Sequence, residues 1–489
     1  MGIAGNAFLN VIGITLILKG VFDNVVPMGI ISLWSGNVLI PITAVFDKLP
    51  HFGVMMMLSR RLVERHPRSI FHHLRRNWDA HAVEDGAWVR LKCVDCSQDR
   101  PGGGHDLMQS RCDRFIFIML LIMGKETAYE NLRRAVGRMA DVEAVWVPIE
   151  MTPTEWYAHV PPVSWNHSLT YGLVARRRVL EAERTCGPFR AAFFNHILAA
   201  VFLSDFRSRV PSVDSMDVTP STLYAQGDAY YVSRAAGGRS MMRDQKRRFA
   251  QRIYGSAAHL IPYSELTRRS LTDDYSISRE NATVLPPGID LSFWNGNERR
   301  KAKPAGAPFV ALFVGDDFRR KGGDLILRIA RQPACSRIEF HCVTRETVDD
   351  VPPNVVMHRG VARNSEELRR LYRTADVYLM PTRADFGPTN AISEALAMGL
   401  PVITTGVGGI DETVENGVQG IIIPPDDEES LLHAIVRIRE DSALCERMSR
   451  AARARAEDLL DVEKNAARIV DIMRVSASPA GRQRIDAHV

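Results

Sequence analysis

The chain has 489 residues. A single hydrophobic core rarely supports a chain of this length, so at least two domains are predicted. A formal net charge of +5 is too small to indicate nucleic-acid binding, although it is compatible with anionic substrates or an anionic membrane face. Seven scattered cysteines, an odd number, form no disulfide framework, which favours a cytoplasmic location.

Residues 1–107 show no regular alternation of strands and helices, and they are predicted to form an N-terminal extension of undefined structure. Two uncharged stretches, Met1–Leu18 and Asn24–Phe46, approach the length of a membrane span. Because Gly and Asn interrupt both stretches, a small buried or poorly ordered segment is favoured, with a membrane-associated hairpin as the alternative. A true start near Met108 is a further alternative. No basic residue precedes the first apolar run, so no secretory signal is predicted.

Cys93, Cys96, His105 and Cys112 are residue types that bind zinc. Zinc sites commonly combine two such pairs at a defined spacing, and no matching second pair follows. The chain also contains no Asp-x-Asp pair of the kind that bridges a metal ion to a diphosphate. We therefore predict no metal site.

Strands and helices alternate from Arg114 onward, a pattern typical of a parallel sheet covered by helices. The apolar run Phe115–Met123 indicates a strand buried on both faces. Further strands are predicted at 145–148, 191–194, 210–217 and 259–263, with helices at 127–139 and 173–185. These elements define an N-terminal domain, residues 108–290.

The same alternation restarts at Pro308. Strands are predicted at 308–315, 338–343, 355–358, 377–380 and 401–404, with helices at 324–330, 366–373, 390–398 and 428–439. They define a second domain, residues 308–458, followed by a helix at 461–473 and a loose tail within 459–489. Pro286, Pro287 and Gly288 interrupt the rhythm. We interpret the region as a hinge, with the linker at 291–307, although its composition also suits an ordinary loop.

The segment Gly315–Gly323 places two arginines and a lysine between the end of a strand and the start of a helix. Its glycines let backbone approach an oxyanion, and the helix N-terminus adds partial positive charge. The segment therefore suits a diphosphate, although it is not a Walker loop. A solvated basic turn is the alternative interpretation.

Glu394 lies early in a mostly apolar helix that follows the loop Asp385–Asn390. A carboxylate near buried surface requires donors, which ribose or sugar hydroxyls can supply. The alternative is a carboxylate that only complements the helix dipole.

These segments together carry a resemblance to a known family. Val284–Asp290, Phe313–Gly322, Phe386–Val402 and Gly408–Gly420 resemble, in order and spacing, the motifs of GT-B glycosyltransferases of family 4. The resemblance covers about three quarters of the chain, from Arg114 to Met473. It implies an α/β fold with two Rossmann-like, doubly wound domains that face a cleft. It further implies a retaining, metal-independent transferase whose co-substrate is a nucleotide-sugar and which needs no cofactor.

The resemblance assigns roles to individual residues. It implies that Lys321 and Arg320 neutralise the diphosphate and that Glu394 holds the ribose hydroxyls. It places acceptor contacts near Gly124 and Lys125, with His196 as a further candidate, although a structural histidine is favoured there. Asp217 is either the family's strand-end acid or a turn residue. The donor site is expected to comprise Gly315, Arg319, Asp385, Phe386, Gly387, Pro388, Thr389, Asn390 and Arg345.

Two positions depart from the family pattern. Asp316 stands where the family often has an arginine, which makes Arg345 a candidate replacement. Phe386 stands where the family has the first of two acids, with Asp385 one residue earlier. The expected partners are a nucleotide-sugar donor and a sugar, polysaccharide or lipid-linked acceptor, without nucleic acid, and with peripheral membrane contact as an alternative. The rival functions are a GT-B glycoside phosphorylase, a non-catalytic nucleotide- or carbohydrate-binding relative, and a membrane-anchored scaffold built on residues 1–107.

Overall fold

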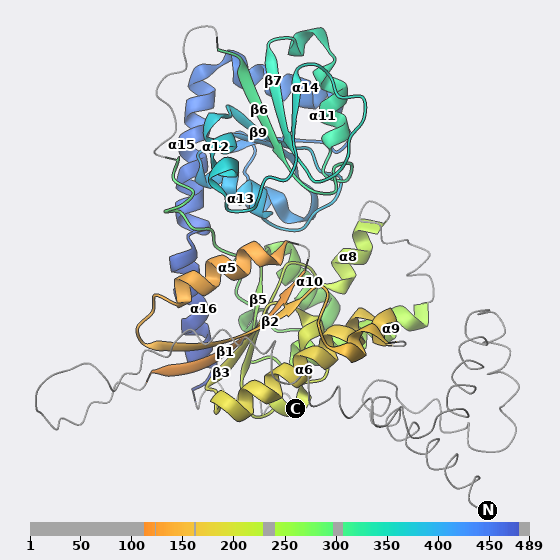
Figure 1. Cartoon of the computed structure of the whole chain (residues 1–489), viewed down its shortest axis with the longest axis vertical. Coiled ribbons are helices and arrows are strands. Elements are labelled where there is room, and N and C mark those ends of the chain that lie inside the picture. Colours follow the sequence, from red (N-terminus) through yellow and green to blue (C-terminus); the bar gives the residue numbers. More distant parts are fainter. Residues whose placement is uncertain (1–111, 123, 161–162, 228–239, 297–306, 479–489) are drawn as a thin grey trace, which may run out of the picture. The chain divides into compact units, whose positions relative to one another are not determined.

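The computed structural model describes residues 112–122, 124–160, 163–227, 240–296 and 307–478. All of them fall within one structural unit, residues 90–489, and they form two parallel sheets that are each covered by helices (Figure 1). This confirms the predicted α/β class. The predicted extension, with Cys93, Cys96, His105 and Met108, lies outside the described residues.

The N-terminal domain contains a sheet with the strand order β2-β1-β3-β4-β5, and every pair in it is parallel. Its strands are β1 (Asp113–Leu121), β2 (Val142–Glu150), β3 (Ala191–Phe194), β4 (Ser212–Met216) and β5 (His259–Pro262). Its helices are α5 (Lys125–Val136), α6 (His167–Cys186), α7 (Ser204–Arg207), α8 (Pro220–Gln226), α9 (Ser240–Gly255) and α10 (Glu265–Tyr275), with 3-10 turns η2 (Trp156–His159), η3 (Val163–Trp165), η4 (Ile197–Ala200) and η6 (Arg279–Asn281).

Strand β1 explains why an unbroken apolar run can be a strand. Successive side chains of a strand point to opposite faces of the sheet. Phe115 and Phe117 therefore pack in one core with α5, whereas Ile116 and Ile118 pack in a second core with α6. A strand with a core on each face has no position for a polar residue.

The second domain contains a sheet with the order β11-β10-β9-β6-β7-β8, again parallel throughout. Its strands are β6 (Phe309–Val314), β7 (Ile338–Val343), β8 (Val355–His358), β9 (Val377–Met380), β10 (Val402–Thr405) and β11 (Gly420–Ile423). The helices after β6 are α11 (Gly323–Ala330), α12 (Glu366–Thr374), α13 (Asn390–Ala397), α14 (Glu428–Glu440), α15 (Ser442–Leu459) and α16 (Val462–Ser476), with 3-10 turns η8 (Pro333–Cys335) and η9 (Val407–Glu412).

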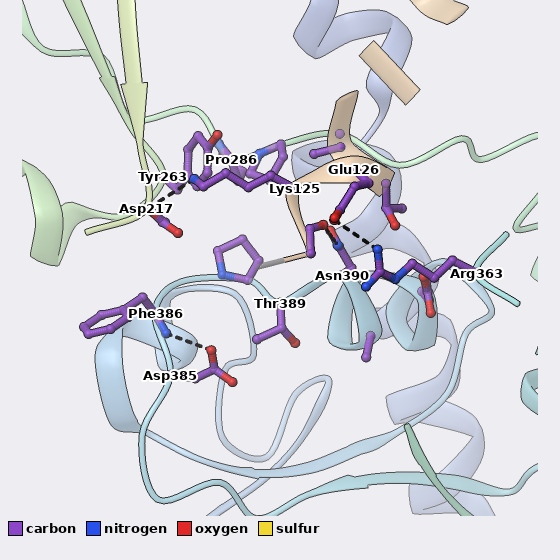
Figure 2. Close-up of a pocket in the computed structure, with 18 of the residues that line it drawn as sticks. Lys125, Glu126, Asp217, Tyr263, Pro286, Arg363, Asp385, Phe386, Thr389 and Asn390 are labelled. Atoms are coloured by element: carbon purple, nitrogen blue, oxygen red, sulfur yellow. Dashed lines mark hydrogen bonds and ion pairs between the residues drawn. The ribbon is translucent and has the colours of Figure 1, made fainter. Parts of the chain in front are cut away.

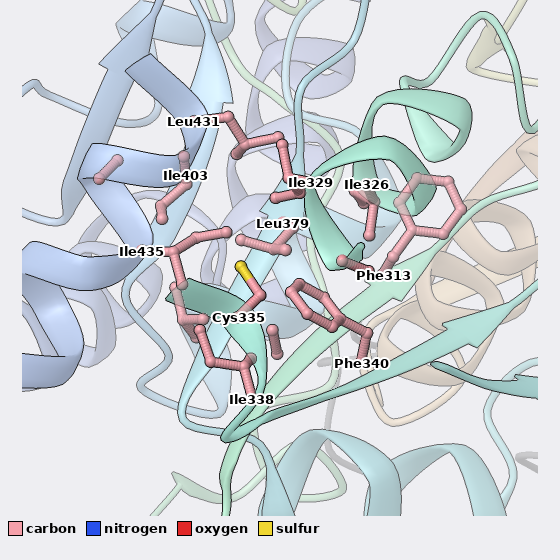
Figure 3. Packing of buried hydrophobic residues seen from close by; sticks show 14 of the residues in the cluster. Phe313, Ile326, Ile329, Cys335, Ile338, Phe340, Leu379, Ile403, Leu431 and Ile435 are labelled. Atoms are coloured by element: carbon pink, nitrogen blue, oxygen red, sulfur yellow. The ribbon is translucent and has the colours of Figure 1, made fainter. Parts of the chain in front are cut away.

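One core of this domain lies between its sheet and the helices α11 and α14 (Figure 3). Phe313 and Phe340 from the sheet meet Ile326 and Ile329 from α11, and all four side chains are at most 1% exposed. Removing a buried phenylalanine side chain of this kind costs about 3–5 kcal/mol of stability.

The last helix does not belong to the domain that precedes it in sequence. After α15 the chain crosses the segment before Leu291, where Ile289 and Asp461 form a parallel bridge. Helix α16 then packs against α5, and Ile469 and Met473 join the core of Phe115. The helix was predicted, but as part of a separate C-terminal segment after the second domain. Helix α15 and strand β11 were not predicted.

Candidate functional site

A cavity of about 960 Å³ is lined by both domains and by the crossing segment at Pro286–Gly288 (Figure 2). Most of the other residues that line it lie at or after the carboxyl ends of β1, β3, β4 and β5 in one sheet and of β6, β7, β8 and β9 in the other, and α16 also contributes. In open α/β sheets, ligands bind at this edge.

Two helices open toward the cavity from glycines in the left-handed region. Gly124 has a φ of 84° and precedes α5, and Gly322 has a φ of 83° and precedes α11. Neither helix receives a side-chain cap at its first residue. The first N–H group of each helix donates to a backbone carbonyl instead, that of Lys125 to Ile122 and that of Gly323 to Phe318. The two helix N-termini give the cavity partial positive charge from both domains.

The turn before α11 carries the cavity's main positive charges, Lys321 and Arg320, whose side chains are mostly buried. Asp385 faces both, with its Oδ2 atom 3.3 Å from Arg320 and 3.5 Å from Lys321. Arg320 also donates to Asp317 and to the carbonyl of Ala384. The two cations are therefore held in place by carboxylates and backbone.

The two other predicted cations of this region lie differently. Arg319 is exposed and does not line the cavity. Arg345 does line it, but Asp316 accepts from the Arg345 Nε at 2.8 Å. Burial raises and this pairing lowers the pKa of Asp316, and the net pKa lies below its ordinary value. Asp316, the residue that departs from the family pattern, therefore holds Arg345, which was the candidate to replace the missing family arginine.

The loop from Asp385 to Asn390 enters the cavity and leads into α13. Thr389 caps this helix by accepting from the Ile392 N–H, and Asn390 donates to the carbonyl of Gly124 at 2.9 Å. The N–H of Gly387 donates to Gly408 and is not directed at the cavity. Gly387, which was expected in the donor site, therefore directs its N–H away from the cavity.

Glu394 lines the cavity from the second turn of α13 and is 4% exposed. Burial raises the pKa of its carboxyl to about 7, although the Tyr372 hydroxyl, Lys321 and Arg363 favour the charged form. A carboxyl that titrates near neutral pH exchanges protonation states readily when a ligand brings hydrogen-bond donors.

In the N-terminal domain, Lys125 and Asp217 form an ion pair of 3.2 Å beside the ring of Tyr263 (Figure 2). Burial opposes both charges, but the pairing keeps the pKa of Lys125 above and that of Asp217 below their ordinary values. His196 does not line the cavity, and its Nδ1 accepts from the Leu198 N–H. Burial and the nearby Lys125 cation lower the pKa of His196 to about 4, so it is neutral.

Contacts between the domains surround the cavity. Arg363 pairs with Glu126 at 3.0 Å, and both side chains line the cavity (Figure 2). On another side, the Glu412 carboxylate accepts from the N–H groups of Glu265 and Leu266 at the start of α10. The cavity is therefore held between two sets of polar contacts.

Most residues predicted for the site line this one cavity: Gly124, Lys125, Gly315, Arg320, Lys321, Arg345, Asp385, Phe386, Pro388, Thr389, Asn390 and Glu394. Arg319, Gly387 and His196 do not. Sequence reasoning missed Asn195, Tyr263, Arg363 and Glu126. The end of the predicted strand 355–358 was a usable signal for Arg363, because the loops after parallel strands meet at the ligand edge.

Comparisons with known proteins agree with this geometry. The family model of glycosyl transferases group 1 matches residues 308–441. We call the domain that these residues form the group 1 domain, after the family whose model they match. The domain they form holds Gly315, Arg320, Lys321, Asp385 and Glu394.

Curated relatives of the chain are named D-inositol 3-phosphate glycosyltransferase. The one from Paenarthrobacter aurescens is 28% identical over 226 residues, which cover 42% of this chain and 55% of the relative. The one from Nocardiopsis dassonvillei is 30% identical over 209 residues, covering 37% and 48%. The chain thus spans about half the length of the curated relatives it matches.

Solved structures extend the likeness to both domains. Sucrose-phosphate synthase from Thermosynechococcus elongatus aligns with a TM-score of 0.61 at 18% identity, covering 75% of this chain and 100% of that chain. Anabaena HepE in complex with UDP-glucose aligns with a TM-score of 0.54 at 15% identity, covering 74% and 99%. The predicted GT-B fold is therefore confirmed.

Two further properties hold for the described residues. None of their helices combines the length and the apolar composition that a membrane span requires. Within the same residues, no group of three or more His, Cys, Asp and Glu side chains is arranged to hold a metal ion.

Proposed function

We propose that the protein transfers a sugar from a nucleotide-sugar to a hydroxyl acceptor in the interdomain cavity. One observation carries this proposal: Lys321 and Arg320 stand at the start of α11, and the cavity that they line is also lined by the buried Glu394 on α13. Cations with a helix N-terminus suit a diphosphate, and a buried carboxylate suits a diol.

The leaving group is the nucleoside diphosphate, which gains negative charge as the bond to the sugar breaks. Lys321 and Arg320 are positioned to stabilise that charge, because protein groups already hold them in the cavity. Asp385 is the anion that both cations face. Anabaena HepE, solved with UDP and with UDP-glucose, supports a nucleotide donor for this fold.

Glu394 accepts hydrogen bonds from the ribose hydroxyls in this proposal. Its raised pKa means that nucleotide binding favours loss of the proton, because only the carboxylate accepts from both hydroxyls. The carboxylate thereby gains the donors that its burial otherwise denies it.

The acceptor binds in the N-terminal half of the cavity, near Gly124 and Lys125. The contacts of Asn390 with Gly124 and of Arg363 with Glu126 restrict access of water, which would otherwise hydrolyse the donor. A sugar, a polysaccharide or a lipid-linked compound can supply the acceptor hydroxyl. The D-inositol 3-phosphate glycosyltransferases are relatives whose name supports a polyol acceptor.

We further propose retention of configuration and independence from metal ions. The family resemblance supports retention. Metal-independent transfer is supported by the side-chain cations at the diphosphate position, because they can neutralise the leaving group themselves.

The first experiment is a thermal-shift panel of nucleoside diphosphates and nucleotide-sugars on the full chain, followed by turnover of the best donor with and without EDTA. A ligand at 100 times its Kd stabilises the folded state by about 2.7 kcal/mol. No stabilisation by any nucleotide, together with activity on sugar phosphates, would instead identify a phosphorylase. Nucleotide binding without transfer would identify a non-catalytic relative, and loss of turnover in EDTA would refute metal independence.

A further inference from the structure

The segment between β2 and α6 exposes large apolar side chains that proteins normally bury. Trp156 and Trp165 are 67% and 66% exposed, and Met151 and Val160 are 65% and 45% exposed. We call these four residues the tryptophan patch. By contrast, the other two described tryptophans, Trp146 and Trp294, are buried. Single exposed apolar side chains are common on protein surfaces, whereas several in one short segment indicate an interaction surface.

The patch rests on an ordered scaffold. The turns η2 and η3 pack against each other and against α6. The Thr170 hydroxyl donates to the Val163 carbonyl at 2.7 Å, and the Trp156 ring meets the Tyr157 ring edge to face at 5.9 Å. The two tryptophans are therefore presented by the fold.

The charge beside the patch is positive. Arg176 and Arg177 on α6 are exposed; burial raises the pKa of the Tyr157 hydroxyl, although the nearby Arg177 cation lowers it. Two acids lie in or next to this segment, the buried Glu155 and the exposed Glu150, and Arg178 pairs with both at 2.8 Å. An occupant of this surface should therefore combine an apolar region with negative charge.

The patch begins at the acceptor side of the cavity. Met151 both belongs to the patch and lines the cavity, and the Tyr171 hydroxyl of α6 donates to its carbonyl at 3.0 Å. Whatever binds the patch therefore lies next to the N-terminal half of the cavity.

We propose that the tryptophan patch docks on an anionic lipid membrane. Tryptophan prefers the membrane–water interface, where its ring is apolar and its N–H stays hydrated, and arginines attract anionic headgroups. Resting on the proposed function, this makes the acceptor a lipid-linked compound whose anchor stays in the bilayer while its hydroxyl reaches the cavity past Met151. The uncharged stretches of residues 1–18 and 24–46 offer no counter-charge for Arg176 and Arg177, which favours a lipid surface over that segment.

The test is sedimentation of the full chain with vesicles, without nucleotide or acceptor. We expect the wild type to sediment with vesicles of equal phosphatidylcholine and phosphatidylglycerol. The double variant Trp156→Ser, Trp165→Ser should bind them about 10-fold more weakly. The variant Arg176→Ser, Arg177→Ser should lose the preference for these vesicles over pure phosphatidylcholine. The matched control Val356→Ser, Val475→Ser removes apolar side chains exposed elsewhere, by 39% and 69%, and should bind like the wild type.

Three results would overturn the proposal. One is a wild type that does not sediment with the anionic vesicles. Another is a tryptophan double variant that sediments as well as the wild type, which would assign the contact to another part of the chain. The third is a change of molecular mass in that variant without vesicles, which would make the patch a contact between copies. The sedimentation test does not depend on sugar transfer. If the protein binds vesicles but a separate assay detects no sugar transfer, only the proposed function is refuted.

Discussion

The two halves of the cavity differ in how they use charge. The half from the group 1 domain concentrates Lys321 and Arg320 in the turn before α11, where they face Asp385 and lie close to a titratable Glu394. The N-terminal half pairs Lys125 with Asp217, so these two charges compensate each other. The first arrangement suits a ligand of constant chemistry, a diphosphate. The second suits a ligand recognised by shape and hydroxyl groups, which can differ between relatives while the fold stays the same.

The largest effect should come from removing a cation of the group 1 half. We expect Lys321→Ala to lower the rate of transfer by about 100-fold or more, because a charge aimed at the leaving group is lost in a site of low dielectric constant. The neighbouring, exposed Arg319 offers a matched control, and Arg319→Ala should stay within about 2-fold. Steady-state kinetics measure both variants. Similar losses in the two would mean that the turn acts only through its overall charge.

A second comparison uses the two left-handed glycines. Alanine at either position costs about 1–2 kcal/mol for the backbone conformation alone. A Cβ atom at Gly322 would also lie 2.2 Å from the Pro381 oxygen, whereas at Gly124 its nearest neighbour is 3.9 Å away. In urea unfolding, Gly322→Ala should therefore lose clearly more stability than Gly124→Ala. Equal losses would show that the backbone around Pro381 yields to the added carbon.

The Lys125–Asp217 pair tests whether the N-terminal half is independent of the donor. Lys125→Met leaves Asp217 without its cation and should cost about 1–3 kcal/mol of stability. Adding Asp217→Asn should recover most of that loss, because no unpaired charge remains. Neither variant should change the thermal shift that a nucleotide produces. A weakened nucleotide shift in the double variant would show that the two halves do not bind separately.

The smallest predicted effect concerns pH. With a pKa of about 7 for Glu394, the affinity for a nucleotide-sugar should rise by about 10-fold from pH 6 to pH 8, because the bound state requires the carboxylate. Glu394→Gln should abolish this dependence in isothermal titration, and a variant that keeps it would assign it elsewhere. The effect of pH on folding stability in the absence of nucleotide has the opposite sign. The folded pKa lies above the unfolded value of 4.5, so this group's contribution to stability is lost as pH rises from 4.5 through about 7.

Much of the fold could be predicted because its signals are local. Apolar runs such as Phe115–Met123 correspond to strands with a core on each face, and glycines mark where strands turn into helices. Helix α15 was missed because alanines and arginines obscure its apolar stripe, although Leu444, Met448, Ala452 and Ala456 are buried. The position of α16 depends on contacts between residues that are far apart in the sequence, and no local sequence pattern indicates such contacts.

The residues of the candidate site could likewise be predicted only where a local sequence signal marks them. Consecutive residues of a turn or at the end of a strand point in different directions. Arg319 and Arg320 are alike in sequence but only Arg320 lines the cavity, and Asn195 lines it whereas His196 does not. Arg363 and Tyr263 lie outside the motifs, and only the meeting of strand ends brings them to the cavity.

The return of α16 has a consequence for biosynthesis. Arg474 of α16 forms a hydrogen bond of 2.8 Å with Asp113 at the start of β1, 361 residues earlier in the chain. A ribosome makes chains from the N-terminus, and domains generally fold as they emerge. Here the first domain cannot complete its core until the last helix has been translated, whereas the core of the second domain between its sheet and α11 and α14 is complete earlier. The nascent protein should therefore fold in the reverse of its order of synthesis, with the second domain folded while the N-terminal domain still exposes the face that α16 will cover.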